Sequence, residues 1–342
     1  MHHFYHHANC ADGFAAACIA YRALLSRGIP ADQITVTAVN YGNQRVIPEV
    51  GDYFVDDHLI YLDFTPPKDQ LDTLVNDVSN FDGTVKLTII DHHEKAAPLH
   101  GYTFNDGTRL WEQTQPPTFE SVFNLAKSGA GLTWSYFYPD AAQPYGITLI
   151  EHRDLGHAFQ QPDHPHTSDA LNLHAFLFRS TPRTFDAWEH VIYGNADRLQ
   201  VHECHFGARL RASDGWIIDA AVDRCHWLDF SQSPGLQVSL CPPLIVPLPG
   251  LARIPAVNGL DAGMISDACQ ALLRAHPSAP FSASWFVNHR TGQIVYSLRS
   301  RQPGHPDGHV NVSTIAAACS QGGGGHPCAA GFQTLTPIPF AS

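Results

Sequence analysis

The stretch Thr88-Ile89-Ile90-Asp91-His92-His93-Glu94 places an acid and two imidazoles directly after an apolar, β-branched run. The run over 87–90 predicts a buried strand. Ligands of open α/β sheets bind at the carboxyl ends of strands, and a carboxylate with two histidines suits a divalent transition metal. Taken alone, the pattern also fits an ordinary polar strand end, because Asp-His-His arises readily in a chain with 22 histidines. The rest of the chain has to decide between these interpretations.

Two further predicted strands end in the same way. The first strand ends in His7, and Asp12 follows in the turn before an Ala-rich helix expected over 14–26. The apolar run over 59–62 predicts another strand, which ends at Asp63. Strands that alternate with helices predict a mostly parallel sheet, whose carboxyl ends meet at one edge. Together with the Asp-His-His stretch, these polar residues form one constellation.

A fourth polar cluster follows further along the chain. Residues 119–127 and 132–137 predict helices, and the apolar run over 147–150 leads into Glu151-His152-Arg153-Asp154. Asp154 is therefore a candidate fourth acid of the constellation. The alternative interpretation of this residue is an ion pair with its neighbour Arg153.

The second half of the chain predicts a separate mixed α/β domain. Residues 215–257 are rich in β-branched residues and proline, and helices are expected over 262–275 and 312–319. The segments 282–287 and 293–298 alternate between apolar and polar residues like the two strands of a hairpin. We place the boundary between the two halves broadly within residues 180 to 215.

Four consecutive glycines precede His326 near the end of the chain. Such a run is costly to order for packing alone, and it lets the backbone approach a ligand closely with its amides directed at an anion. A flexible linker is the alternative. It fits poorly, because the apolar stretch Cys328-Ala329-Ala330 follows at once.

The composition restricts the classes of function. The 342 residues predict two domains, and 44% hydrophobic residues are enough for real cores. A net charge of −12 argues against broad electrostatic binding to long nucleic acid. No apolar run approaches the roughly 20 residues of a membrane span, the start of the chain lacks a secretory signal, and the eight cysteines form no CxxC pair. We therefore expect a cytoplasmic protein with reduced thiols and no membrane partner.

These motifs together resemble the DHH phosphoesterase superfamily with its C-terminal DHHA1 domain, in the RecJ-like and nanoRNase-type subgroup. Asp91-His92-His93 matches the motif that gives the superfamily its name. Gly322-Gly323-Gly324-Gly325-His326, followed by Ala329-Ala330-Gly331-Phe332, matches the C-terminal GGGH signature. His7-Ala8-Asn9-Cys10-Ala11-Asp12-Gly13 is similar to the first motif of the closest subgroup, although many relatives carry two aspartates there. The resemblance covers nearly the whole chain.

The resemblance implies an α/β fold with two domains. It implies an N-terminal, mainly parallel-sheet DHH catalytic domain with flanking helices over residues 1–180 and a helical linker over 181–215. A smaller mixed α/β DHHA1 domain for substrate binding would occupy residues 216–342. The active site is expected in the cleft between the domains.

The resemblance also implies a centre of two divalent ions, Mn²⁺ with Mg²⁺ or Co²⁺ as alternatives. Asp63 would bridge the ions. One ion would take His7 and Asp12 as further ligands, and the other would take His92 and Asp154. His152 could compete with Asp154 for that role, and Asn9 lies close to the first set of ligands.

Three adjacent residues would perform the catalysis, namely Asp91, His92 and His93. Asp91 would be a metal ligand or would orient His92. His93 would contact the scissile phosphate or the leaving oxygen. Two such ions supply the nucleophile and the charge neutralisation that phosphodiester hydrolysis needs.

Substrate binding is expected from residues in both halves of the sequence: Asn9, Arg299, Gly323, Gly324, Gly325 and His326. Arginine can bind a phosphate through two parallel hydrogen bonds. The expected activity is hydrolysis of short oligonucleotides or dinucleotides to mononucleotides. The alternatives are pAp, a cyclic dinucleotide or polyphosphate as the substrate, or a nucleotide-binding protein without catalysis. The expected partner is a short phosphorylated substrate rather than long nucleic acid, and a homodimer stays open.

Overall fold

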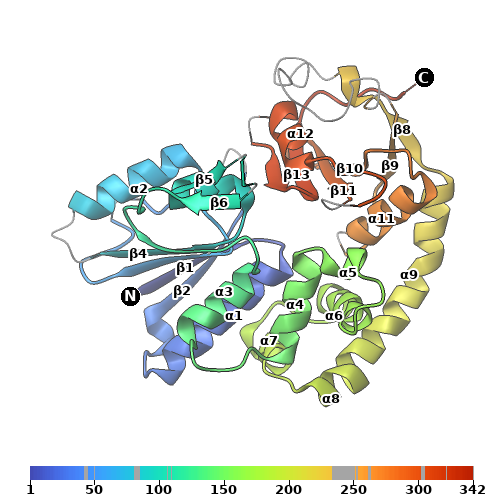
Figure 1. Ribbon diagram of the computed structural model, residues 1–342. Helices are drawn as coiled ribbons and strands as arrows, with labels where there is room; N and C mark the ends of the chain where they lie inside the picture. The colour runs from blue at the N-terminus through green and yellow to red at the C-terminus, as the bar shows by residue number, and fades with distance from the viewer. Residues whose placement is uncertain are drawn as a thin grey trace. The chain divides into compact units, whose positions relative to one another are not determined.

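A five-stranded parallel sheet forms the centre of the N-terminal half of the protein (Figure 1). Its strands are β1 (His2–His7), β2 (Ile34–Val39), β3 (His58–Leu62), β4 (Lys86–Asp91) and β7 (Glu120–Phe123). They lie in the order β2-β1-β3-β4-β7, and every neighbouring pair is parallel. Because the chain runs from β1 to β2 on one side and to β3 on the other, the topological switch point lies between β1 and β3. Open α/β sheets bind ligands at that point.

The computed structural model describes residues 1–41, 45–49, 51–80, 85–105, 107–108, 110–232, 251, 253–260, 263–301, 305–320 and 322–341. The chain separates into two units, and each is described by itself. The first unit comprises Met1–Ala158 and Asp163–Gly207. The second comprises Phe159–Pro162 and Ala208–Ser342.

Helices surround the sheet of the first unit. Those that lie wholly within this unit are α1 (Ala11–Ser26), α2 (Lys68–Asn80), α3 (Gly129–Phe137), α4 (Tyr145–Asp154), α6 (Thr167–Arg179), α7 (Phe185–Ile192) and α8 (Ala196–Leu199). The helices α5 (His157–Gln160) and α9 (His205–Asp223) each contribute residues to both units. The unit also contains the 3-10 helices η1 (Ala31–Gln33) and η2 (Glu94–His100), the π-helix η3 (Gln200–Cys204), and a hairpin of β5 (Tyr102–Asn105) and β6 (Leu110–Gln113). No helix among the described residues has the length and apolar character needed to cross a membrane.

Both faces of the parallel sheet are buried, and the alternation within β3 shows how. Ile60 and Leu62 pack on one face with residues of α1 and α3. Leu59 and Tyr61 point to the other face and pack with residues of α2. This double burial explains why β3 is apolar from Leu59 to Leu62 rather than alternating. It also fixes the sheet against helices on both sides, which makes its carboxyl edge a rigid base for a site.

A six-stranded mixed sheet forms the second unit, in the order β12-β13-β11-β10-β9-β8. Its elements are β8 (His226–Leu228), η4 (Phe230–Gln232), β9 (Ile254–Asn258), α11 (Ile265–Ala275), β10 (Phe281–Val287), β11 (Ile294–Ser300), α12 (Val312–Cys319), β12 (Gly324–His326) and β13 (Ala329–Thr334). The pair β9–β10 is parallel and the other pairs are antiparallel.

The predicted fold class is confirmed: a parallel sheet with flanking helices is followed by a second, mixed sheet. The predicted hairpin forms β10 and β11, and the predicted helix over 312–319 is α12. The helix predicted over 119–127 is wrong. Its central residues form β7, because Ser121, Val122 and Phe123 pair with the exposed edge of β4. The residues of 215–257 up to Asp223 continue α9, and 233–250 lie outside the described residues.

Candidate metal centre

Three parallel strands deliver polar residues to the same edge of the sheet. Leu62 pairs with His6 on β1 and with Ile90 on β4. The residues that follow these partners along each strand therefore lie at one level, and they are His7, Asp63 and Asp91. The level lies at the carboxyl ends of β1, β3 and β4, beside the switch point where α/β sheets hold their ligands.

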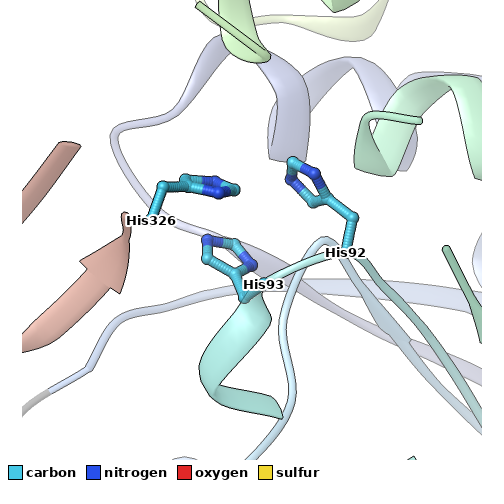
Figure 2. A group of neighbouring side chains, drawn as sticks. All are labelled: His92, His93 and His326. Carbon is cyan, nitrogen blue, oxygen red and sulfur yellow. The ribbon is translucent and has the colours of Figure 1, made fainter. Parts of the chain in front are cut away.

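His92 follows β4 and faces three carboxylates. Its Nε2 atom lies 3.1 Å from Oδ1 of Asp63, 3.4 Å from Oδ2 of Asp154 and 3.6 Å from Oδ2 of Asp12. Figure 2 shows His92 and the adjacent His93 leaving the end of the strand. The third residue drawn there, His326, belongs to β12 of the second unit. The centre of the first unit thus gathers acids from α1, from the loop after β3 and from the end of α4.

The side chains at this edge form two trios with the geometry of cation ligands. The first contains His7, Asp63 and His93, and the second contains Asp12, His92 and Asp154. Within each trio the ligand atoms lie within 4.8 Å of one another. The trios divide the residues differently from the assignment that the resemblance implies, in which Asp12 shares an ion with His7.

The residues fit divalent ions. Among the residues that the structure describes, Oδ1 and Oδ2 of Asp63, Oδ2 of Asp154 and Nδ1 of His7 are buried without a hydrogen-bond partner. Buried polar atoms are normally satisfied, and a buried carboxylate is tolerated when it is paired or coordinates a metal. A donor set of carboxylates and imidazoles suits Mn²⁺ and related ions.

The electrostatics of the centre point the same way. Burial, followed by the charges of Asp63 and Asp154, raises the pKa of Asp12 well above its usual value. Burial opposes the ionisation of Asp63 as well, but the neighbouring imidazoles of His7 and His92 hold the pKa of this carboxyl well below its usual value. Burial alone would lower the pKa of His92, whereas the three facing carboxylates raise it to about 10. Without a metal the cluster is short of positive charge, and a cation would supply it.

The amino terminus of α3 holds Asp12 in place. The amide of Gly129 donates to Oδ2 of Asp12 at 2.5 Å, and the amide of Ala130 donates to Oδ1 at 3.0 Å. Helix amino termini favour negative charge. Ser128 caps the helix by accepting a hydrogen bond from Gly131 at 3.2 Å. The sequence analysis missed this support, although the run Ser-Gly-Ala-Gly at a helix start was the available signal.

Gly129 also allows the helix to approach Asp63. A Cβ atom on this glycine would lie 2.5 Å from Cβ of Asp63. Asp63 itself has a φ of 56°, in the left-handed region that non-glycine residues adopt infrequently. Such backbone conformations cluster at functional sites. The loop after β3 is therefore shaped to aim the Asp63 carboxylate at the centre.

Asp91 belongs to neither trio, and its side chain contacts His93, a member of the first. Its Oδ1 atom accepts hydrogen bonds from the His92 amide at 2.8 Å and the His93 amide at 3.2 Å. It also accepts from Nδ1 of His93 at 2.7 Å. Burial would raise the pKa of Asp91, but the charge of His93 and its hydrogen bond hold it well below its usual value. The geometry thus makes Asp91 an orienting group for His93, whereas the resemblance implies metal ligation or contact with His92.

The remaining predicted residues of the first unit lie as follows. The structure brings Asp154 to His92, whereas Nε2 of His152 lies 3.0 Å from Oγ1 of Thr167. Burial and three neighbouring histidines lower the pKa of His152 to about 4. Asn9 lies in the loop before α1 with a φ of 56°, and its side chain accepts a hydrogen bond from Arg183 at 3.1 Å.

Within the second unit, Arg299 and His326 lie in one row of the sheet. Arg299 on β11 pairs with Ala329 on β13, and Ala329 pairs with His326 on β12. Paired residues of neighbouring strands share a face. The two side chains therefore stand on the same face, two strands or about 10 Å apart, with a small alanine between them. Arg299 also donates to Oγ of Ser266 at 3.1 Å.

Two of the predicted substrate-binding glycines have packing roles in the second unit. A Cβ atom on Gly323 would lie 1.9 Å from the carbonyl oxygen of Ala316 on α12. Gly325 has a φ of 140°, and its Cβ atom would lie 2.6 Å from the carbonyl oxygen of Ala329. Gly324 begins β12 and pairs with Gly331. The glycine run is thus an ordered turn and strand, and its binding role stays a prediction.

Comparisons with known proteins give the following relatives. No protein-family model matches the sequence. Over 332 residues the chain is 25% identical to the uncharacterized protein R106 of Acanthamoeba polyphaga mimivirus, covering 96% of this chain and 66% of that protein. The chain therefore spans just under two thirds of the length of this relative.

Several solved structures are similar at low identity. The pGpG-specific phosphodiesterase PggH from Vibrio cholerae is 10% identical with a TM-score of 0.44, over 97% of this chain and 92% of that one. RecJ from Thermus thermophilus in complex with Mn²⁺ is 14% identical with a TM-score of 0.41, over 97% and 49% of the two chains. An uncharacterized protein from Helicobacter pylori is 12% identical with a TM-score of 0.36, over 99% and 95%.

Proposed function

We propose that this chain is a metal-dependent phosphoesterase of the DHH superfamily that hydrolyses short oligonucleotides or dinucleotides to mononucleotides. One observation carries the proposal: carboxylates of Asp12, Asp63 and Asp154 converge in a buried site on Nε2 of His92. Several of their oxygens are buried without a hydrogen-bond partner among the described residues. Structural packing gives no reason to bury three acids together, whereas binding cations does.

The two trios would each hold one divalent ion, Mn²⁺ in our proposal, with Mg²⁺ and Co²⁺ as alternatives. Oδ1 of Asp63 in one trio lies 3.1 Å from Nε2 of His92 in the other, so the two candidate sites are adjacent. When bound, such a pair of ions neutralises charge on a phosphoryl group and lowers the pKa of water.

The protein's own residues orient the reacting groups. Asp91 accepts the hydrogen bond from Nδ1 of His93, so His93 presents Nε2 to an ion or to a phosphate oxygen. Amides at the start of α3 hold both oxygens of Asp12. The loops and the packed parallel strands thus hold the metal-ligating side chains in one geometry. Catalysis by positioning of the reactants requires such a fixed geometry.

The second unit supports recognition of a phosphate. Arg299 and His326 stand on one face of its sheet, with the small side chain of Ala329 between them. A guanidinium and an imidazole are both suited to phosphate oxygens. The net charge of −12 opposes long nucleic acids, and this favours a short substrate.

A substrate panel tests the proposal. Purified protein with Mn²⁺ is offered a labelled RNA dinucleotide, a longer RNA, pAp, a cyclic dinucleotide and polyphosphate side by side. We expect the dinucleotide to be hydrolysed fastest and EDTA to abolish the reaction. Asp63→Asn should lose activity by at least about 100-fold, while the matched control Asp69→Asn, at an exposed position on α2, should keep it.

Each outcome of the panel has a defined meaning. Faster turnover of pAp, a cyclic dinucleotide or polyphosphate would keep the phosphoesterase and replace its substrate. Nucleotide binding without hydrolysis of any member would overturn the catalytic proposal in favour of a binding protein. Equal activity of Asp63→Asn and Asp69→Asn would exclude the metal centre described above.

A further inference from the structure

A buried line of hydrogen bonds extends behind Asp91, away from the two trios. Oγ1 of Thr65 lies 2.5 Å from Oδ2 of Asp91 and 2.9 Å from Nε2 of His100. Nδ1 of His100 in turn lies 2.6 Å from Oγ of Ser121. The line connects the loop after β3, the end of η2 and the edge strand β7. None of these three residues belongs to the motifs that predicted the site.

The line is closed to solvent at its centre. Asp91 and His100 are fully buried, and Thr65 is 2% exposed. The ring of His100 stacks on Phe123 with a centroid distance of 4.7 Å, and Phe119 contacts it edge-on at 5.4 Å. The imidazole is therefore held in one plane by aromatic neighbours, so its two nitrogens point at fixed partners.

The chemistry of the groups fixes the direction of every hydrogen bond. An ionised carboxylate only accepts, so the single hydroxyl proton of Thr65 goes to Asp91. The Thr65 oxygen can then only accept from His100, which requires the proton of His100 to be on Nε2. Nδ1 of His100 is consequently an acceptor, and the hydroxyl of Ser121 donates to it.

The same direction continues through Asp91 to His93. Oδ1 of Asp91 is the acceptor for Nδ1 of His93, so this nitrogen carries a proton. Burial lowers the pKa of His100 to about 4, so this ring stays neutral around pH 7 and keeps a single tautomer. A neutral ring with one fixed tautomer transmits orientation without adding charge to the centre.

We propose that Thr65, His100 and Ser121 are positioning residues that lock Asp91 and thereby hold His93 with its proton on Nδ1. Removing the Thr65 hydroxyl takes the donor from Oδ2 of Asp91, so the carboxylate is held only through the hydrogen bonds to Oδ1. The acceptor of His93 is then less firmly fixed, and the ring partly populates the tautomer with the proton on Nε2. The catalytic part of this inference rests on the proposed phosphoesterase function, whereas the tautomer part does not.

Two readouts test the inference on three principal variants, and Ser121→Ala adds a fourth. The principal variants are Thr65→Val, which deletes the hydroxyl at nearly constant shape, Thr65→Ser, which keeps it, and Thr73→Val as a matched change on the exposed face of α2. Burial opposes protonation of His93, but the charge of Asp91 raises the pKa of this ring. Nitrogen-15 NMR of the imidazoles in metal-free protein is therefore recorded at alkaline pH, where both rings are neutral, and reports the tautomers of His93 and His100. Steady-state hydrolysis of the dinucleotide with Mn²⁺ reports kcat and KM.

In wild type we expect the Nδ1–H tautomer of His93 and the Nε2–H tautomer of His100. Thr65→Val should mix the tautomers of His93 and lower kcat by about 10- to 100-fold with little change in KM. Thr65→Ser should restore both readouts, and Thr73→Val should alter neither. Ser121→Ala provides a milder second variant, which should mix the tautomers of His100 if Thr65→Val does not fold.

Unchanged tautomers in both Thr65→Val and Ser121→Ala would overturn the inference. So would a loss of kcat that Thr65→Ser fails to restore, because that pattern indicates packing rather than the hydroxyl. The two proposals fail separately. If wild type hydrolyses no phosphoester but Thr65→Val still mixes the His93 tautomers, the result supports the positioning role of Thr65 and contradicts the proposed function.

Discussion

Gly129 and Asp63 approach each other so closely that a Cβ atom on the glycine would lie 2.5 Å from Cβ of the aspartate. Carbon atoms pack at about 3.5–4.0 Å, so no other residue fits at position 129 without moving the loop after β3. The contact joins the start of α3 to the acid at the end of β3. Since the same glycine amide donates to Asp12, one residue sets the spacing of two carboxylates.

Replacing this glycine should therefore disable the centre. Gly129→Ala should displace Asp63 and destabilise the protein by about 1–3 kcal/mol, the usual cost of overpacking. Mn²⁺ affinity, measured by calorimetry, should fall by at least about 10-fold. Gly215→Ala on α9 is the matched control, because a Cβ atom there meets nothing within 4 Å. It should leave affinity unchanged, and equal affinity of the two variants would contradict the prediction.

Divalent ions should stabilise the fold. An ion that binds only the native state at 100 times its Kd adds about 2.7 kcal/mol to the free energy of unfolding. We expect Mn²⁺ to raise the melting temperature of wild type and to leave Asp154→Asn nearly unchanged. Asp140→Asn, at an exposed position, serves as the control and should respond like wild type. A full Mn²⁺ response in Asp154→Asn would remove this residue from the centre.

Arg299 should contribute to substrate binding rather than to metal binding. Charge-assisted hydrogen bonds contribute about 1.5–3 kcal/mol, so Arg299→Ala should raise KM for a dinucleotide by about 10- to 100-fold. Mn²⁺ affinity should not change. Arg299→Lys should recover only part of the loss, because lysine lacks the planar fork, and Arg290→Ala in the exposed hairpin turn should behave as wild type. A loss of Mn²⁺ affinity without a change in KM would contradict the assignment of Arg299 to substrate binding.

His58 should make stability depend on pH. Burial, and then the charge of His2, lowers its pKa from 6.5 to about 4. As the pH falls, His58 of the unfolded chain takes up a proton before His58 of the folded protein does. Protonation therefore does not reduce the free energy of unfolding above about pH 6.5, and it reduces this free energy progressively between about pH 6.5 and 4. Relative to His58→Gln, wild type should lose about 1–2 kcal/mol of unfolding free energy between pH 7.5 and 5.

Urea unfolding of both proteins at the two pH values measures this difference. His58 hydrogen-bonds Oγ1 of Thr88 at 2.7 Å through its Nε2 atom, and glutamine can keep a similar contact. The comparison therefore isolates the titration from the lost hydrogen bond. Parallel losses of stability in wild type and His58→Gln would show that other groups cause the pH dependence.

Local patterns predicted much of the first unit. The runs that became β3 and β4 were identified to within one residue at each end, because buried parallel strands are short, apolar and followed by polar residues. The helix predicted over 119–127 failed because Ser121, Val122 and Phe123 gain their strand hydrogen bonds from distant β4. No local periodicity records such a partner, and tertiary pairing overrides weak propensity.

The site shows the same division between local and distant information. The polar strand ends indicated which acids and imidazoles matter, and the structure brings Asp12, Asp63 and Asp154 together. Which residues form each trio depends on side-chain directions, which spacing does not encode. The amide donors at the start of α3 and the line through Thr65 and His100 also come from long-range packing. The run Ser128-Gly129-Ala130-Gly131 indicated where α3 begins but not which carboxylate its amides bind, and no sequence pattern indicated the line.

The acids of the centre stand at positions 12, 63 and 154, and they meet only when β1 has paired with β3 and α4 has packed against α1 and α3. Contacts of such high sequence separation form late in folding. The metal-free protein must therefore fold although its own acids repel one another, and a bound ion cannot assist the early steps of folding. Mn²⁺ should then slow unfolding and leave the refolding rate nearly unchanged, as expected for interactions absent from the transition state. The ion would stabilise the completed fold against unfolding and would not take part in the folding nucleus.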